Sequence, residues 1–232
     1  MSFLDLPALL NPIDLAALAT LLLSWFAIGW YIENPPANRP SVSRLMATYR
    51  RQWMDQMLTR DPRIFDAQLI GQLRQGAAFF ASATMLAIGG AMALVGNTEP
   101  LRKVAQDLTQ RADPAILLEL KMILLVLMIS MAFLRYVWAH RLFGYTAVLM
   151  AAVPNDPEHS DAATMAAKAG EIGVLAARAF TRGMRTTYFA LASAAWLLGP
   201  WALIAATLAT VAMLWRREFT SASREVLLRD HA

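Results

Sequence analysis

Four arginines within fourteen residues give this sequence its clearest chemical feature. Arg50 and Arg51 are adjacent, and Arg60 and Arg63 follow shortly after them. A guanidinium group can donate two parallel hydrogen bonds to a single phosphate or carboxylate. Asp66 follows closely and could hold one of these arginines in place. These residue types in this order indicate a site for an anion or for a phospholipid head group.

Two later segments contribute further arginines. Arg135 and Arg141 follow a long apolar stretch, and Arg182 and Arg185 precede another. If all these side chains meet in one cavity, they form a site for an anion or a phospholipid head group, and if they fan outward, they simply hold anionic lipid. The sequence leaves both alternatives open. The candidate binding residues are Arg50, Arg51, Arg60, Arg63, Asp66, Arg135, Arg141 and Arg185.

Catalytic and metal-binding patterns are scarce. His140, His159 and His231 are isolated, and there is no cysteine. The chain has no glycine-rich phosphate loop and no G-x-S-x-G motif. We therefore expect no enzyme activity, no metal and no cofactor. One alternative stays open, an intramembrane enzyme that acts on lipid through Asp66 or Glu119 with an arginine clamp, although paired carboxylates at helical spacing within a span are missing.

The composition is that of a membrane protein. Apolar residues make up 57% of the 232 residues and charged residues only 16%, which is too apolar for an ordinary soluble domain. The formal net charge is +4, but the basic residues lie between long apolar stretches. Anionic lipid head groups are therefore the expected partners, and nucleic acid is not.

Four apolar stretches are long enough to cross a bilayer, whose core needs about 20 helical residues. They predict an all-α bundle of four transmembrane helices with cytoplasmic amphipathic helices, forming a single membrane domain over residues 1–232. The fourth contains Gly199 and Pro200 and is expected to kink there. The predicted spans are 13–32, 76–95, 115–138 and 188–215.

The second predicted span is rich in small residues, which let helices approach closely in a membrane. Ala83, Ala87 and Gly90 form its candidate packing face. We expect this helix to lie inside the bundle and to pair with its counterpart in a second copy. The sequence therefore predicts a homo-oligomer.

Lysine and arginine counts orient the predicted spans, because the side with more of them faces the cytoplasm. The first and third connections together carry 13, and the other side carries 8. The counts predict an inner-membrane protein with its N-terminus and its C-terminus outside. The motif "WRREF" at 215–219 conflicts with that placement of the C-terminus.

Two amphipathic helices are predicted on the cytoplasmic side, at 43–60 and 161–180. In the first, Met46, Tyr49 and Trp53 follow helical spacing. That helix either lies in the membrane interface or packs against the end of the bundle. The second is the predicted docking face for a larger complex.

Several motifs in order resemble an integral membrane family of bacteria and plants, domain-of-unknown-function family 599. They are "RRQWMDQMLTRDPRIFDAQLIGQL", "FFASATMLAIGG", "FLRYVWAHRLFGYTAVLMAAVP" and "GMRTTYFALASAAWLLGPW" followed by "RREFTS". The resemblance extends over about 15–223 and implies a multi-span membrane protein, without an activity or a cofactor. It draws attention to Arg51, Trp53, Met54, Arg60, Asp66, Phe80, Ser82, Arg141, Tyr145, Gly183, Arg185, Tyr188, Phe189, Arg217 and Phe219.

The leading functional hypothesis is a homo-oligomeric protein with an arginine-rich cytoplasmic face. It would either bind lipid head groups or anions, or pass an anion as a channel or transporter does. The alternative is an accessory or scaffold subunit of a larger membrane complex, with other membrane proteins as partners.

Overall fold

The computed structural model describes residues 10–95 and 114–229, and within these ranges the chain forms helices and turns without any strand. The prediction of an all-α fold is confirmed. The elements are α2 (Pro12–Glu33), α3 (Val42–Met57), α4 (Ile64–Val95), α6 (Ala115–Ala152), α7 (Ala162–Ala194), the 3-10 helix η2 (Ala195–Leu198), α8 (Pro200–Phe219) and α9 (Ala222–Leu228).

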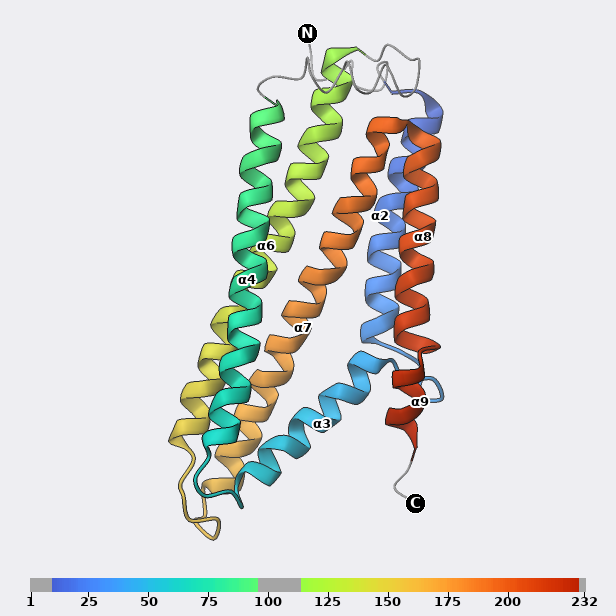
Figure 1. Ribbon diagram of the computed structural model, residues 1–232. Coiled ribbons are helices and arrows are strands. Elements are labelled where there is room, and N and C mark those ends of the chain that lie inside the picture. The colour runs from blue at the N-terminus through green and yellow to red at the C-terminus, as the bar shows by residue number, and fades with distance from the viewer. Residues whose placement is uncertain (1–9, 96–113, 230–232) are drawn as a thin grey trace.

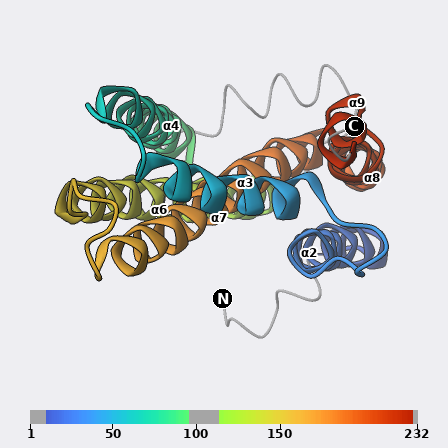
Figure 2. The ribbon, with the colours of Figure 1, turned by 90° about the horizontal axis from the view of Figure 1, so that it is seen from below.

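The long helices lie side by side and alternate in direction (Figure 1). α6 packs against both α4 and α7, while α2 pairs with α8 beside the upper half of α7. α3 runs obliquely across the lower half of the bundle and packs against α7 (Figure 1 and Figure 2). This helix therefore brings its arginines beside the lower half of α7.

Three of the described helices are long and apolar enough to cross a membrane, namely α2, α4 and α6. They contain the first three predicted spans. α4 begins at Ile64, so one continuous helix joins the end of the arginine-rich connection to the second predicted span. α6 continues to Ala152, well past the end of the predicted third span.

The prediction of a single fourth span over 188–215 is wrong. The helix stops at Ala194, and Gly199 has φ 118° and ψ 170°. Glycine adopts this positive φ readily because it has no Cβ, and Pro200 then starts α8 at a position where a missing N–H costs nothing. The chain therefore reverses direction where a kink was expected, as Figure 1 shows.

The reversal also determines where α8 ends. α8 returns beside α2, and its lower end joins the start of α3, where the Ser43 hydroxyl donates to Glu218 at 2.9 Å. The Arg224 guanidinium donates to the Pro40 carbonyl at 2.9 Å. The start of α2 and the end of α8 thus lie at opposite ends of the bundle (Figure 1), while the side of the membrane that each faces stays a prediction.

The helix predicted at 161–180 exists, but it is the lower half of α7. Its small residues face α3 and α6 within the same chain. A Cβ added at Gly170 would lie 3.2 Å from Met54 Cγ, and one at Gly173 would lie 3.5 Å from Thr146 Cγ2. This face is therefore buried, whereas Lys168, Glu171 and Leu175 of the same stretch are exposed, and docking of a partner there stays a prediction.

The prediction that the second span lies inside the bundle is also wrong for the single chain. α4 lies at the edge and contacts α6 (Figure 2). Ala83, Ala87 and Gly90 are all exposed. A Cβ added at Gly90 would meet no atom within 4 Å. Pairing of this face with a second copy stays a prediction.

Buried side chains form an upper and a lower cluster. The upper one includes Phe189 and Trp196, and the Trp196 indole donates to buried Asp14 at 2.7 Å. The lower one includes Met54 and Phe143 and joins α3 to α6 and α7. The arginines described next lie beside these clusters, near the lower end of α2.

Candidate functional site

An arginine-lined cavity of about 300 Å³ lies between the lower end of α2, α3 and α7. Glu33 is the one acid that lines it. Apolar side chains such as Ile32 and Val174 form part of its wall. We call it the arginine cavity. Its arginines are Arg44, Arg50, Arg51, Arg178 and Arg185.

Helical periodicity explains how these side chains converge. On α3, Arg44 and Arg51 are two turns apart, and on α7, Arg178 and Arg185 are also two turns apart, so each pair lies on one face of its helix. α3 packs on α7 through buried methionines. The two arginine-bearing faces therefore meet beside the end of α2.

Glu33 and two arginines of α7 form the ion-pair network of the site. The Glu33 carboxylate accepts a hydrogen bond from Arg182 Nε at 2.8 Å, and it accepts two more from the terminal nitrogens of Arg182 and Arg185. Arg185 is only 5% exposed and passes close to Gly29, where a Cβ would lie 4.0 Å from its Nε. One carboxylate is thus shared by two guanidinium groups.

Arg50 differs from the other arginines of the site. It lines the arginine cavity, yet no hydrogen bond or ion pair joins its side chain to any other described residue. Burial lowers the pKa of its guanidinium from the usual value. A half-buried cation without an acid partner is costly, and an anion in the cavity would relieve that cost.

A second cavity, also of about 300 Å³, lies on the other side of Glu33 and Arg185. We call it the lateral cavity. It opens beside Phe26 and Trp30 of α2, which are 64% and 67% exposed. Arg135 of α6 also lines it, hydrogen-bonded to the Thr186 hydroxyl. The two cavities therefore share one carboxylate and one guanidinium.

The far end of α3 carries a different arrangement around Asp66, which is completely buried. Its Oδ1 accepts from the Trp53 indole at 2.6 Å and from Arg60. Arg63 donates to the Val153 and Pro154 carbonyls at 2.8 and 2.7 Å. These bonds tie the start of α4 to the ends of α3 and α6.

A third cavity, of about 370 Å³, lies beside this cluster between α4 and α6. Two of the residues that line it are Arg63 and Arg74. Arg63 is already bonded to backbone carbonyls, and Arg74 Nε donates to His140 Nε2 at 3.2 Å. Both arginines have partners within the chain, whereas Arg50 has none among the described residues.

The predicted site residues thus separate into four places. Arg50, Arg51 and Arg185 line the arginine cavity, and Arg135 lines the lateral cavity. Arg141 lies outside both, with its Nε bonded to the Tyr145 hydroxyl at 2.7 Å. Asp66, Arg60 and Arg63 gather at the other end of α3. The structure therefore does not bring all eight residues into one cavity.

Sequence reasoning missed three charged residues that line the arginine cavity. Arg44 and Arg178 were counted as charges but not as site residues, although both lie one or two turns from predicted members. Glu33 was overlooked altogether. A signal for it exists, because Glu33 directly follows the first apolar stretch and directly precedes the arginine-rich connection.

Metal-ligating side chains do not cluster in this part of the molecule. Across residues 10–95 and 114–229, no three His, Cys, Asp or Glu side chains are placed to hold a metal ion. The expectations of no metal and no cofactor stay predictions.

Comparison with known proteins identifies a family. A family described as "Protein of unknown function, DUF599" matches residues 16–223. No curated protein and no solved structure matches the chain.

Proposed function

Because the chain belongs to the DUF599 family, whose description assigns no activity, we propose its function from its own geometry. It is a membrane protein that binds phosphate-bearing anions, lipid head groups in particular, in the arginine cavity at its cytoplasmic face. The role is one of binding and not of catalysis. The observation that carries the proposal is Arg50, a half-buried guanidinium with no partner among the described residues.

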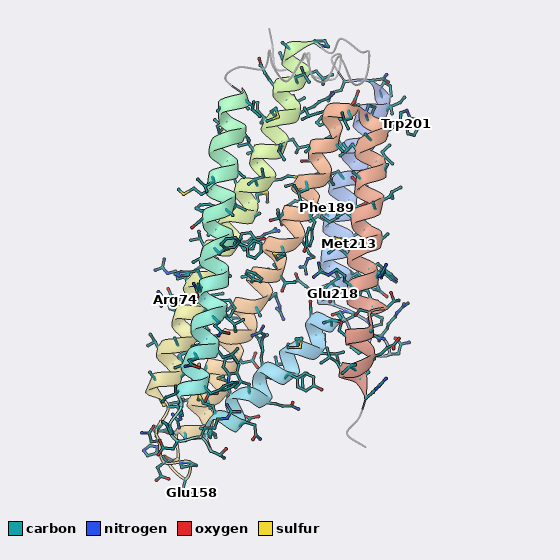
Figure 3. The ribbon with its side chains drawn as sticks, viewed as in Figure 1. Arg74, Glu158, Phe189, Trp201, Met213 and Glu218 are labelled. Carbon is teal, nitrogen blue, oxygen red and sulfur yellow. The ribbon has the colours of Figure 1, made fainter. Side chains whose placement is uncertain are left out.

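The proposed membrane covers the upper part of the bundle. α2 has 22 residues, about 33 Å of helix, which suits a bilayer core of roughly 30 Å. Arg74 and Glu218 lie at nearly the same height on opposite edges, with Phe189 and Met213 above them (Figure 3). This level is the proposed lower boundary, and it passes close to the arginine cavity.

The helix directions support an orientation with the N-terminal end of α2 outside and α8 ending in the cytoplasm. Five helical segments then cross the membrane: α2, α8 and the upper parts of α4, α6 and α7. Seventeen of the 21 lysines and arginines lie at or below the lower boundary, because the four after Trp215 join the 13 of the two connections. The positive-inside rule favours this arrangement more strongly than four spans.

Phosphate suits the arginine cavity chemically. Guanidinium groups bind phosphate oxygens in pairs, and anionic lipid head groups concentrate at the cytoplasmic surface. The apolar wall formed by residues such as Ile32 and Val174 suits the glycerol part of a lipid. The chemistry shared by a lipid head group and a free phosphate is the phosphate group itself.

The test measures binding of phosphatidic acid to the full-length protein in phosphatidylcholine nanodiscs. Losing a charged hydrogen bond costs about 1.5 to 3 kcal/mol, so Arg50→Gln should weaken binding about tenfold or more. Arg141→Gln is the matched control, because Arg141 is exposed and bonded to Tyr145 outside both cavities. Equal binding by wild type and Arg50→Gln would rule the proposal out.

We also propose that the protein is a homo-oligomer, with the exposed small residues of α4 as the contact. Gly90→Leu tests this cleanly, because a side chain there would meet no atom of its own chain within 4 Å. We expect the variant to fold as the wild type does and to change the mass of the complex measured in nanodiscs. An unchanged mass would exclude this face.

A further inference from the structure

We infer that Glu33 is a resident carboxylate that an incoming phosphate displaces from Arg182 and Arg185, and that the site therefore takes phosphomonoester dianions in preference to phosphodiesters. The inference rests on the proposed binding function and adds its ligand class. It assigns Glu33 a role as an internal competitor for the guanidinium pair.

The position of Glu33 is the first observation behind this inference. Its carboxylate lies where the arginine cavity and the lateral cavity meet, and both cavities are lined by Glu33 and Arg185. Both carboxylate oxygens accept hydrogen bonds from guanidinium nitrogens. Phosphate oxygens make the same paired bonds to guanidinium groups, so the carboxylate occupies the place that suits a phosphate.

The second observation is that the carboxylate has an accessible place to go. Glu33 is the last residue of α2, and its side chain is 16% exposed. The next residue, Asn34, is exposed and also lines the lateral cavity. A change of side-chain rotamer is therefore enough to move the carboxylate away from the arginines and into water.

Charge then decides which ligand can displace it. A phosphodiester carries one negative charge and would replace one carboxylate charge with another. It would also lose its translational freedom, which a tethered side chain does not have to lose. A phosphomonoester carries nearly two negative charges at neutral pH and three strong acceptor oxygens. The additional charge can interact with Arg50 or with Arg135, which line the two cavities on either side.

The ligand can reach the site from two sources. Phe26 and Trp30 flank the lateral cavity, and aromatic side chains of this kind favour the head-group layer. A phosphatidic acid molecule can therefore enter sideways from the bilayer. Inorganic phosphate carries the same dianion chemistry and would enter through the arginine cavity, on the cytoplasmic side.

The experiment compares three probes on the full-length protein in phosphatidylcholine nanodiscs: phosphatidic acid, phosphatidylglycerol and added inorganic phosphate. In the wild type, we expect measurable binding of phosphatidic acid or inorganic phosphate and much weaker binding of phosphatidylglycerol. Glu33→Gln removes the competitor, so affinity for phosphatidic acid and phosphatidylglycerol should rise by about tenfold or more. Binding of phosphatidic acid but not of inorganic phosphate would identify the membrane as the source, and binding of both would add the cytoplasm.

Two further variants keep the test decisive. Glu218→Gln is the matched control for the loss of one negative charge near Arg185. The charge of Glu218 also acts on Arg185, but its carboxylate is hydrogen-bonded to Ser43 and not to the arginines. Glu33→Asp keeps the charge and shortens the side chain, so it should give a smaller rise in affinity and serves if Glu33→Gln fails to fold. An unchanged affinity in the Glu33 variants, or an equal rise in Glu218→Gln, would overturn the inference. If Arg50→Gln still lowers phosphatidic acid binding, the proposed function survives that result.

Discussion

Two carboxylates hold arginines near opposite ends of α3, and they do so in different surroundings. Asp66 is fully buried, and its Oδ1 accepts from Trp53 and Arg60. Glu33 bonds Arg182 and Arg185 beside a cavity that four more arginines line. In the first arrangement, Oδ1 has two donors while the buried Oδ2 has none among the described residues. In the second, a neighbouring guanidinium, Arg50, has no partner among the described residues.

This difference separates a structural ion pair from the proposed binding site. An ion pair between an arginine and an acid does not by itself indicate a binding site, because both regions contain such a pair. What distinguishes the Glu33 region is a half-buried guanidinium, Arg50, that the chain leaves without a partner among the described residues. Substitutions at Asp66 should therefore affect folding, and substitutions at Arg50 should affect binding.

The largest effect on stability is expected from Asp66→Ala. It leaves the Trp53 indole and the Arg60 guanidinium without their acceptor. Because the Arg60 side chain is 37% exposed and can turn to water, the expected cost is about 1 to 3 kcal/mol. The measurement is the free energy of unfolding in mixed detergent and denaturant micelles. Asp61→Ala, at an exposed acid five residues earlier, is the control and should change little.

Phosphatidic acid binding by the folded fraction of Asp66→Ala should remain at the wild-type level. The cluster around Asp66 lies at the far end of α3 and does not line the arginine cavity. A loss of binding as large as that of Arg50→Gln would mean that the two regions act as one site, and the comparison would fail.

The membrane helices show how far the sequence could predict the fold. Hydropathy located α2, α4 and α6, because a bilayer-spanning helix must be apolar over most of its length. It failed at α7 and α8, because α7 carries polar residues along its lower half and α8 ends in two arginines. The predicted fourth span joined the apolar end of one helix to the apolar start of the next across Gly199.

The candidate site was partly predictable for a related reason. Helical spacing placed Arg50 and Arg51 correctly on one amphipathic helix, but it could not show which other helix this one faces. Arg60 and Arg63 follow in the same stretch and yet belong to the cluster at the other end of α3. The neighbour of α3 depends on tertiary packing, in which Gly170 of α7 admits Met54 at close range.

A smaller effect on stability, of opposite sign, is expected from Arg50→Gln. The wild-type guanidinium loses solvation on burial and gains no partner in return, which is why its pKa is lowered. Glutamine carries no charge to desolvate, so the free energy of unfolding without anionic lipid should stay equal or rise by up to about 1 kcal/mol. A clear loss of stability in phosphatidylcholine alone would show that Arg50 has a structural role, as Asp66 does.

The smallest effect is expected at Arg51 and Glu171, a third kind of ion pair that lies between the two extremes. Arg51 lines the arginine cavity, but its Nε bonds Glu171 at 2.5 Å in a pair whose side chains are 49% and 57% exposed. Water screens such a pair, so Glu171→Gln should lower the free energy of unfolding by only about 0.5 kcal/mol.

The pH dependence of that small difference tests its origin. The hydrogen bond from Arg51 lowers the pKa of Glu171, so the stabilisation is fully present above the usual pKa of glutamate and disappears as the pH falls through the lowered value. Wild type and Glu171→Gln should therefore differ at pH 7 and converge in acid. A difference that persists in acid would point to packing by the side chain. The two carboxylate variants should also differ in phosphatidic acid affinity, which should rise less in Glu171→Gln than in Glu33→Gln. Arg51 is partly exposed, so water solvates it once Glu171 is neutral. Arg185 is buried, so a bound anion is the partner that can replace Glu33.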